Sequence, residues 1–222
     1  MFLTRFRLNP ARRGARKLMA SPHALHAAVR AGFPNDADYA HGARRTLWRL
    51  DVQAQASAVL YVVSPGKPDF THLVEQAGWP TTTEACDTRD YSPLLDTLRA
   101  GQRWAFRLTA NPVHNGRKPE GAKDTQRFGL LRESEQVDWL LNRGQRHGFQ
   151  IALQRDGVPN LALNNRQTMS FRRNSGSVTL VTATYDGVLE VTDADAFRAT
   201  LTAGIGHAKA YGCGLLTLAP LR

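Results

Sequence analysis

The order of strand-like and helix-like patterns constrains the fold of this chain more than any other feature of its sequence. Residues 2–8 (FLTRFRL) alternate as a strand does. Residues 21–34 (SPHALHAAVRAGFP) begin with a capping serine and a proline and end at a glycine and a proline, as a helix does. Residues 45–52 and 56–64 then predict a pair of strands, and residues 69–79 predict a second helix.

The second half of the chain has a similar order of patterns. It predicts a strand, a helix, a short strand, two β-rich runs, a helix and a last strand, at residues 102–112, 133–148, 149–154, 167–193, 193–206 and 214–220. Each half thus reads roughly as βαββαβ, the order of a ferredoxin-like (RRM-like) domain. We therefore expect an α+β fold of two tandem ferredoxin-like domains, residues 1–95 and 96–222, although no internal sequence repeat supports the duplication.

Three segments between these elements lack a clear periodic pattern. Residues 11–17 (ARRGARK) read as a basic loop, and residues 80–93, which are rich in Thr, Asp and Pro, read as a loop or linker. Residues 114–127 are rich in Gly, Lys and Arg, so we expect a mobile basic segment there.

The charge of the chain points to a polyanionic partner. Lys and Arg number 29 against 19 acidic residues, which gives a formal net charge of +10. Nucleic acid is the simplest partner for such a surface, and an anionic membrane surface is the alternative. No apolar run reaches the roughly 18 residues of a membrane-spanning helix. Cys86 and Cys213 form no zinc-binding pattern, so we expect two reduced thiols in a cytoplasmic protein.

The helix expected at residues 21–34 carries the first candidate site. Helical spacing places His23, His26 and Arg30 on one side, with Leu25 and Val29 on the opposite side facing the core. Such a polar side can simply be solvated, or its two histidines can bind a metal, although no nearby carboxylate or cysteine completes a zinc site. A third interpretation is general acid–base catalysis on RNA, because the imidazole pKa lies near neutral pH.

A basic hairpin tip is the second candidate site. Two β-rich runs flank the sequence SFRRNSG, which places Arg172 and Arg173 near a turn. The turn can be merely solvated, or it can be a basic finger that reaches RNA phosphates near the end of a stem.

The third candidate site is a glycine-rich loop near the last strand. In residues 204–220 (GIGHAKAYGCGLLTLAP), four glycines surround His207 and Lys209. The loop lacks the Gly-Lys-Ser/Thr ending of a nucleotide-triphosphate-binding loop, and a strand rather than a helix follows it. It is therefore either a structural turn or a backbone cradle for a phosphate chain.

The sequence resembles a known family at three places. MFLTRFRLNPARRGARK followed by HALHAAVRAGFP is similar to the opening strand, basic loop and His-bearing helix of the CRISPR-associated endoribonuclease CasE family of type I-E systems. WAFRLTANP resembles the central strand of that family. GIGHAKAYGCGLLTLAP resembles its C-terminal glycine-rich signature, which is the most specific of the three.

This resemblance implies the RNA-processing subunit of the Cascade complex, which serves antiviral defence. Such a protein binds the CRISPR repeat stem-loop and cuts it once at the 3′ base of the stem, with no metal or cofactor. Attack by the 2′-OH leaves a 5′-hydroxyl and a 2′,3′-cyclic phosphate. The enzyme then stays bound to its product. The implied partners are repeat RNA and the other Cascade subunits, with no membrane partner and no DNA contact of its own.

The resemblance also assigns roles to residues. The catalytic histidine of the family matches His26, and many members carry a tyrosine at the position of His23, which leaves the role of His23 open. The glycine-loop lysine matches Lys209, and we expect the RNA strand, or the His-bearing helix of the other domain, to lie against this loop. The expected RNA-binding residues are Arg12, Arg13, Arg16, Lys17, Arg30, Arg172, Arg173, His207 and Lys209. Where some relatives continue the hairpin with lysines, this chain has Asn174 and Ser175.

Three other functions fit the same charge and fold. A ferredoxin-like RNA-binding module without cleavage is the first, a metal-dependent nuclease is the second, and a structural subunit without RNA contacts is the third. Their discriminating measurements are cleavage by a His26→Ala variant, activity in excess EDTA, and the salt dependence of RNA binding.

Overall fold

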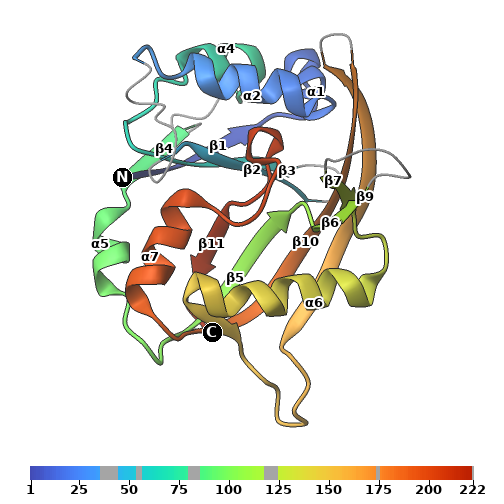
Figure 1. Ribbon diagram of the computed structural model, residues 1–222. Helices are drawn as coiled ribbons and strands as arrows, with labels where there is room; N and C mark the ends of the chain where they lie inside the picture. Colours follow the sequence, from blue (N-terminus) through green and yellow to red (C-terminus); the bar gives the residue numbers. More distant parts are fainter. Residues whose placement is uncertain (36–44, 54–56, 80–85, 118–124, 174–175, 222) are drawn as a thin grey trace. The chain divides into compact units, whose positions relative to one another are not determined.

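The computed structural model describes residues 1–35, 45–53, 57–79, 86–117, 125–173 and 176–221 (Figure 1). The chain forms two compact units. The first contains residues 1–98, 201–204 and 209–215, and the second contains the remaining residues. The glycine-rich loop, which we expected in the second domain, is therefore divided between the two units.

The first unit has the sheet of a ferredoxin-like domain. Its strands are β1 (Phe2–Leu8), β2 (Leu47–Gln53), β3 (Ser57–Ser64) and β4 (Cys86–Asp90). They pair antiparallel in the order β2-β3-β1-β4, as expected for a βαββαβ chain. The helices α1 (Arg13–Met19), α2 (Pro22–Ala31) and α4 (Thr71–Ala77) lie together on one side of this sheet in Figure 1.

The core of the first unit lies between these helices and the sheet. Alternate residues of β1 and β3 point into it, as the period of a strand requires. The helices contribute apolar residues spaced three or four positions apart. The main contributors are Phe6, Leu8, Leu60 and Val62 from the strands and Leu18, Leu25, Val29 and Leu73 from the helices.

The basic loop expected at residues 11–17 is wrong, because α1 begins at Arg13. Ala15 and Leu18 are buried in the core and hold this short helix in place. Gly14 permits a close approach to α4, since a Cβ there would lie 2.2 Å from the backbone oxygen of Gln76. Packing against the core thus outweighs the charged residues that dominate this stretch.

The loop expected at residues 80–93 is also wrong where the structure describes it. β4 pairs with the edge of β1, and α5 (Ser92–Thr97) follows it. The sequence of β4, CDTRD, shows no apolar alternation because this edge strand is largely exposed at its end. Residues 80–85 lie outside the described part of the chain.

The second unit has the same strand order. Its sheet contains β5 (Arg103–Ala110), β8 (Phe149–Ile151), β10 (Gly176–Val191) and β11 (Leu216–Ala219) in the order β11-β5-β10-β8. The helices are α6 (Glu133–Gly144) and α7 (Ala194–Ala203), and a short 3-10 helix, η1 (Gln145–His147), follows α6. The expected tandem of ferredoxin-like domains is therefore confirmed.

A long hairpin extends the second sheet. β9 (Leu161–Arg173) pairs with β10, as the sequence predicted. β5 pairs with β10 only over Ala183–Glu190, so among the described strands the part of β10 before Ala183 pairs with β9 alone. The register places Arg173 opposite Gly176 at the end of this ribbon.

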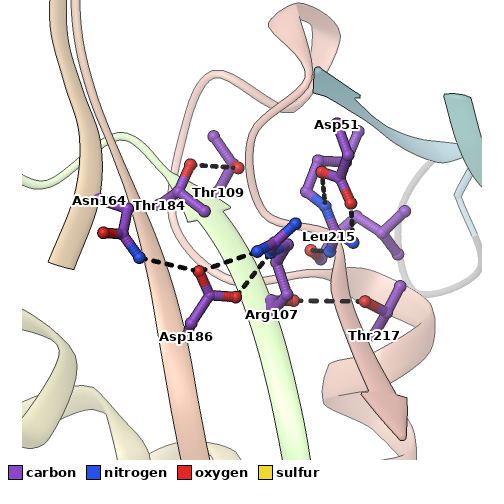
Figure 2. Close-up of polar contacts among 9 residues, drawn as sticks. Asp51, Arg107, Thr109, Asn164, Thr184, Asp186, Leu215 and Thr217 are labelled. Atoms are coloured by element: carbon purple, nitrogen blue, oxygen red, sulfur yellow. Dashed lines mark hydrogen bonds and ion pairs between the residues drawn. The ribbon is translucent and has the colours of Figure 1, made fainter. Parts of the chain in front are cut away.

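A polar network fixes the register of the second sheet (Figure 2). Arg107 donates from Nε to Oδ1 of Asp186 at 2.6 Å and from Nη2 to Oδ2 at 3.1 Å. Asn164 donates to Oδ2 of the same carboxylate at 3.1 Å. The network joins β5, β10 and β9, and the hydroxyls of Thr109 and Thr184 form a further hydrogen bond across the sheet at 2.9 Å.

The mobile segment expected at residues 114–127 is replaced in part by a second hairpin. β6 (Val113–Arg117) pairs with β7 (Thr125–Gly129), and the rings of His114 and Phe128 stack with centroids 5.7 Å apart. Residues 118–124 lie outside the described part of the chain.

Helix α6 buries Gln136, Trp139 and Leu140, whereas Val137 and Leu141 are only half-buried. Tyr185 of β10 holds this face of the helix against the sheet, because its hydroxyl donates to the backbone oxygen of Gln136 at 2.9 Å and its ring stacks with Trp139.

Both cysteines are free thiols, as expected. Cys213, within the glycine-rich loop, is fully buried, and burial raises the pKa of its thiol to about 12. The thiol is therefore neutral at physiological pH and is not a nucleophile. In the described part of the chain, no helix has the length and apolar character needed to cross a membrane.

Candidate functional site

Helix α2 presents its histidines away from the core, as predicted. Ser21 caps the helix by accepting a hydrogen bond from the backbone N–H of Ala24 at 3.2 Å. Leu25 and Val29 are buried and fix the rotation of the helix. His23 and Arg30 are exposed, and His26 is half-buried. The imidazole of His26 is thus partly accessible to solvent.

His72 holds the end of α2, a role that the sequence does not reveal. Its Nε2 lies within 2.9 Å of the backbone oxygen of Ala28, so the ring donates to α2 from the neighbouring helix α4. Phe70 packs edge-on against both His72 and Phe33. A contact between positions 44 residues apart leaves no local signal in the sequence. His72 positions the helix that carries His26.

The glycine-rich loop is shaped by close contacts with β2 of the same unit. Gly212 has φ +82°, and a Cβ there would lie 2.7 Å from the ring of Trp48. Gly204 has φ +75°, and its Cβ would lie 2.8 Å from a methyl group of Leu47. Only glycine fits a positive φ and such an approach together. These two glycines therefore serve a tight structural turn.

This turn carries Lys209 to the His-bearing helix. The short 3-10 helix η2 (Lys209–Tyr211) packs against α2 and β2, all within the first unit. The His-bearing helix, one of the two groups expected against the loop, thus contacts it, but within the first unit and not from another domain. The structure thus brings the elements of His26 and Lys209 together, although 183 positions separate them in the sequence.

A buried ion pair fixes the far end of the loop (Figure 2). Arg49 of β2 is 2% exposed and donates from Nε and Nη2 to the carboxylate of Asp51, at 2.7 and 2.9 Å. Its Nη1 donates to the backbone oxygen of Leu215 at 3.1 Å. The guanidinium also lies over the ring of Tyr61, 5.4 Å from the centroid. Arg49 therefore ties the loop that carries Lys209 to the sheet.

Lys209 lies beside a second cation. Burial lowers the pKa of the Lys209 ammonium group, and the positive charge of Arg45 lowers it further. The Nε of Arg45 is itself buried and has no hydrogen-bond acceptor among the described residues. Two half-buried cations next to each other are unfavourable until an anion neutralises them. Arg45 cannot be recognised from the sequence, because only the fold brings it to Lys209.

The four basic residues that follow β1 have different surroundings; they are Arg12, Arg13, Arg16 and Lys17. The guanidinium of Arg12 donates to three backbone oxygens at the end of α4, those of Val74, Glu75 and Gly78, at 3.3, 2.5 and 3.1 Å. Arg12 therefore caps a helix, a role that its place in a basic run does not indicate.

The other three basic residues of this stretch are exposed. Arg16 donates to the backbone oxygen of Ala11 at 2.5 Å, which orients its side chain along the start of α1. Arg13 and Lys17 are the residues of α1 best placed for contact with a phosphate backbone. RNA contact by Arg12, Arg13, Arg16 and Lys17 stays a prediction.

Three other candidates stay predictions as well. His207 belongs to the second unit and is half-buried. Arg172 and Arg173 lie in β9 near the end of the long hairpin, and their side chains, like residues 174 and 175, are outside the described part of the structure. Within the described residues, no group of three or more His, Cys, Asp and Glu side chains is close enough to hold a metal ion.

Comparison with known proteins identifies the family of this chain. A family model described as "CRISPR associated protein" matches residues 1–220. The CRISPR-associated endoribonuclease Cse3 of Thermus thermophilus is 32% identical over 99% of this chain and 100% of its own. The CRISPR system Cascade subunit CasE of Escherichia coli is 30% identical over 79% of this chain and 89% of its own.

The fold is similar to that of a protein solved with RNA. A structure of the CRISPR endoribonuclease Cse3 bound to a 19-nucleotide RNA superposes with a TM-score of 0.81. That chain is 30% identical, and the match covers 99% of this chain and 100% of that one.

Proposed function

Because this chain belongs to the CRISPR-associated protein family that includes the Cse3 and CasE endoribonucleases, we propose that it is a pre-crRNA-processing endoribonuclease. It binds the stem-loop of the CRISPR repeat and cleaves once at the 3′ base of the stem. The observation that carries the proposal is the packing of η2, with Lys209, against α2, with His26. This arrangement supplies a titratable imidazole and a cation on neighbouring elements.

The proposed reaction is a transesterification that needs no metal. A base removes the proton of the 2′-OH, and the 2′-oxygen attacks the adjacent phosphorus. The bond from phosphorus to the 5′-oxygen breaks, and an acid protonates that oxygen. The products are a 2′,3′-cyclic phosphate and a 5′-hydroxyl. His26 is suited to either proton transfer because an imidazole titrates near neutral pH. His23, three residues earlier on the same side of α2, is the candidate for the other.

Lys209 is proposed to stabilise the negative charge that develops on the phosphate. A cation that is already desolvated stabilises such charge more strongly than one in water. Arg45 adds positive charge at the same place. The binding of a phosphate relieves the repulsion between these two residues, so the free protein stores a preference for an anion here.

The remaining basic residues are proposed to bind the stem-loop. Arg13 and Lys17 on α1 and Arg30 on α2 are exposed and belong to the same unit as His26. Arg172 and Arg173 lie near the end of the β9–β10 hairpin. We propose that the product hairpin stays bound and that the complex joins Cascade in the cytoplasm.

Cleavage of the host's own repeat RNA in excess EDTA tests this proposal. The purified chain is expected to cut the repeat once, at the 3′ base of the stem, at the same rate with and without EDTA. Binding without cleavage would favour the non-catalytic RNA-binding protein. Activity that EDTA abolishes would favour a metal-dependent nuclease.

Replacing Lys209 with methionine is expected to slow cleavage by about 10²- to 10³-fold, the usual cost of removing one group that stabilises transition-state charge. Methionine keeps the length of the side chain and removes its charge. Lys17→Met is the matched control, because Lys17 is an exposed lysine of the same unit. It is expected to weaken binding slightly and to leave the cleavage rate of bound RNA unchanged. Equal rates for both variants would contradict the role of Lys209.

Lys209 also gives the protein an alkaline pH dependence, which the Lys209→Met variant should lack. Since burial and Arg45 lower the pKa of Lys209, this lysine loses its charge at a lower pH than an exposed lysine does. RNA affinity and cleavage are therefore expected to fall as the pH rises through that lowered pKa. The alkaline fall should be absent from Lys209→Met in a pH series of single-turnover rates. An identical alkaline fall in both proteins would assign it to another group.

A further inference from the structure

The second unit contains a pocket that the candidate active site does not use. It has a volume of about 460 Å³ and lies where β6, α6 and η1 meet. This volume is in the range of about 300–1,000 Å³ that is typical of small-molecule sites. All of its lining residues belong to the second unit, so the pocket is separate from the histidines of α2.

One cation of the pocket is held in a fixed orientation. The guanidinium carbon of Arg143 lies 4.6 Å from the ring centroid of Trp139. Trp139 is itself fixed, because its ring stacks with that of Tyr185 at 6.2 Å and an interplanar angle of 19°. A stacked guanidinium keeps its in-plane N–H groups available to an acceptor. Arg143 is therefore preorganised to bind an oxyanion.

A second guanidinium lies near the first. Arg146 also lines the pocket; burial lowers the pKa of Arg143, and the charge of Arg146 lowers it further. Among the described residues neither arginine forms an ion pair with a carboxylate. The repulsion between two such cations is relieved when a phosphate binds between them.

The rest of the lining suits a nucleobase. Val113 and Leu130 give the pocket an apolar wall, and the imidazole of His114, stacked on Phe128, adds a planar one. Unpaired RNA bases commonly stack on such planar side chains.

The acidic residues of the pocket narrow the choice of ligand. Glu135 and Asp138 line it from the earlier turns of α6. Carboxylates repel a second phosphate and can accept hydrogen bonds from the exocyclic amine of a base; one oxygen of Glu135 already accepts from the backbone N–H of Arg132 at 3.3 Å. The pocket therefore matches a group with one phosphate and an amino-bearing base.

We propose that this pocket binds one unpaired RNA nucleotide. Its phosphate lies on Arg143 and Arg146, and its base lies against Val113, Leu130 and His114. The proposal rests on the proposed RNA substrate but not on cleavage, so it can fail while the active-site assignment holds, and the reverse.

The affinity of the full-length protein for short single-stranded RNA tests the pocket. The probes are fluorescein-labelled hexaadenylate, hexacytidylate and hexauridylate, measured by anisotropy over a range of salt concentrations. Arg143→Gln is expected to weaken hexaadenylate and hexacytidylate binding about tenfold. The slope of log Kd against log salt is expected to fall by about 0.7, the value for one phosphate contact on a single strand. Uridine has no exocyclic amine, so hexauridylate is expected to bind more weakly from the start.

Three further variants complete the test. Arg146→Gln, at an exposed position, is expected to reduce the salt slope equally and the affinity about threefold. Arg143→Lys keeps the charge and is expected to keep the slope while losing affinity. Arg155→Gln removes an exposed arginine of the same unit outside the pocket and is expected to change neither.

Two results would overturn the proposal. Equal losses for Arg155→Gln and Arg143→Gln would mean that the RNA responds only to overall charge. Unchanged RNA affinity in both pocket variants, with loss of assembly with a partner subunit, would mean that the pocket binds protein.

Discussion

Replacing His26 with alanine is expected to slow cleavage of the repeat RNA by about 10²- to 10⁴-fold, the usual contribution of one general acid or base. Binding of the stem-loop should change little, because the variant removes a single half-buried side chain and no fixed charge. The fold should also survive, since Leu25 and Val29 anchor α2 and alanine is the best helix former. Single-turnover cleavage rates and stem-loop affinity, measured together, separate catalysis from binding.

His23→Ala is the companion variant. His23 lies on the same side of α2 and is exposed, so its removal changes the helix in a similar way. A loss similar to that of His26→Ala would assign the two proton transfers to the two histidines. A small loss of cleavage rate would mean that a group other than His23 performs the second proton transfer. Cleavage that is unchanged in His26→Ala would show that the catalytic assignment is wrong.

Replacing Arg49 with methionine is expected to lower the free energy of unfolding by about 3–5 kcal/mol, because the variant removes the buried cation that pairs with the nearly buried carboxylate of Asp51. The side chain of Asp51 is only 11% exposed, and the variant also leaves the backbone oxygen of Leu215 without its donor. For a chain of this size, the midpoint of thermal unfolding should fall by roughly 6–20 °C. Calorimetry or circular dichroism measures both quantities.

Arg103→Met is the matched control for Arg49. Arg103 also pairs with a carboxylate through its Nε, that of Glu190 at 2.9 Å, but its side chain is 56% exposed. An exposed pair contributes about 0–1 kcal/mol. The double variant Arg49→Met, Asp51→Leu should recover part of the lost stability, since it removes both charges. Equal effects at Arg49 and Arg103 would show that the buried pair does not anchor the loop.

Much of the fold follows from local patterns in the sequence. Helix α2 has its signals within its own residues: a capping serine, a proline at the first position and apolar residues at helical spacing. The strand order follows from the succession of elements, because a βαββαβ chain has few ways to bury both helices on one sheet. These features depend on neighbouring residues, so the sequence alone could predict them.

The predictions of loops at α1 and β4 are wrong because contacts with residues distant in the sequence determine the structure of both segments. α1 forms from a run of charged residues because Ala15 and Leu18 meet the core, and β4 forms because the edge of β1 needs a partner. Neither cause is visible within the segment itself. The local sequence of each segment therefore predicts a loop.

The candidate site was predictable only in part. The histidines of α2 share one side by helical spacing alone, and the resemblance pointed to Lys209. Arg45 and Arg49 could not be foreseen, because a sequence shows that a residue is charged but not that the fold buries it. His72 was missed for the same reason, since its contact with α2 depends on how α4 packs.

The chemical ends of the cleaved RNA test the central claim most directly. The repeat RNA, and a copy with a single 2′-deoxynucleotide immediately 5′ of the cut, are incubated with the protein in EDTA and analysed by mass spectrometry. If the 2′-OH is the nucleophile, the natural RNA gives a 2′,3′-cyclic phosphate and a 5′-hydroxyl, and the deoxy copy is bound but not cut. Cleavage of the deoxy copy, or a product with a 5′-phosphate, would contradict the mechanism proposed for His26 and Lys209.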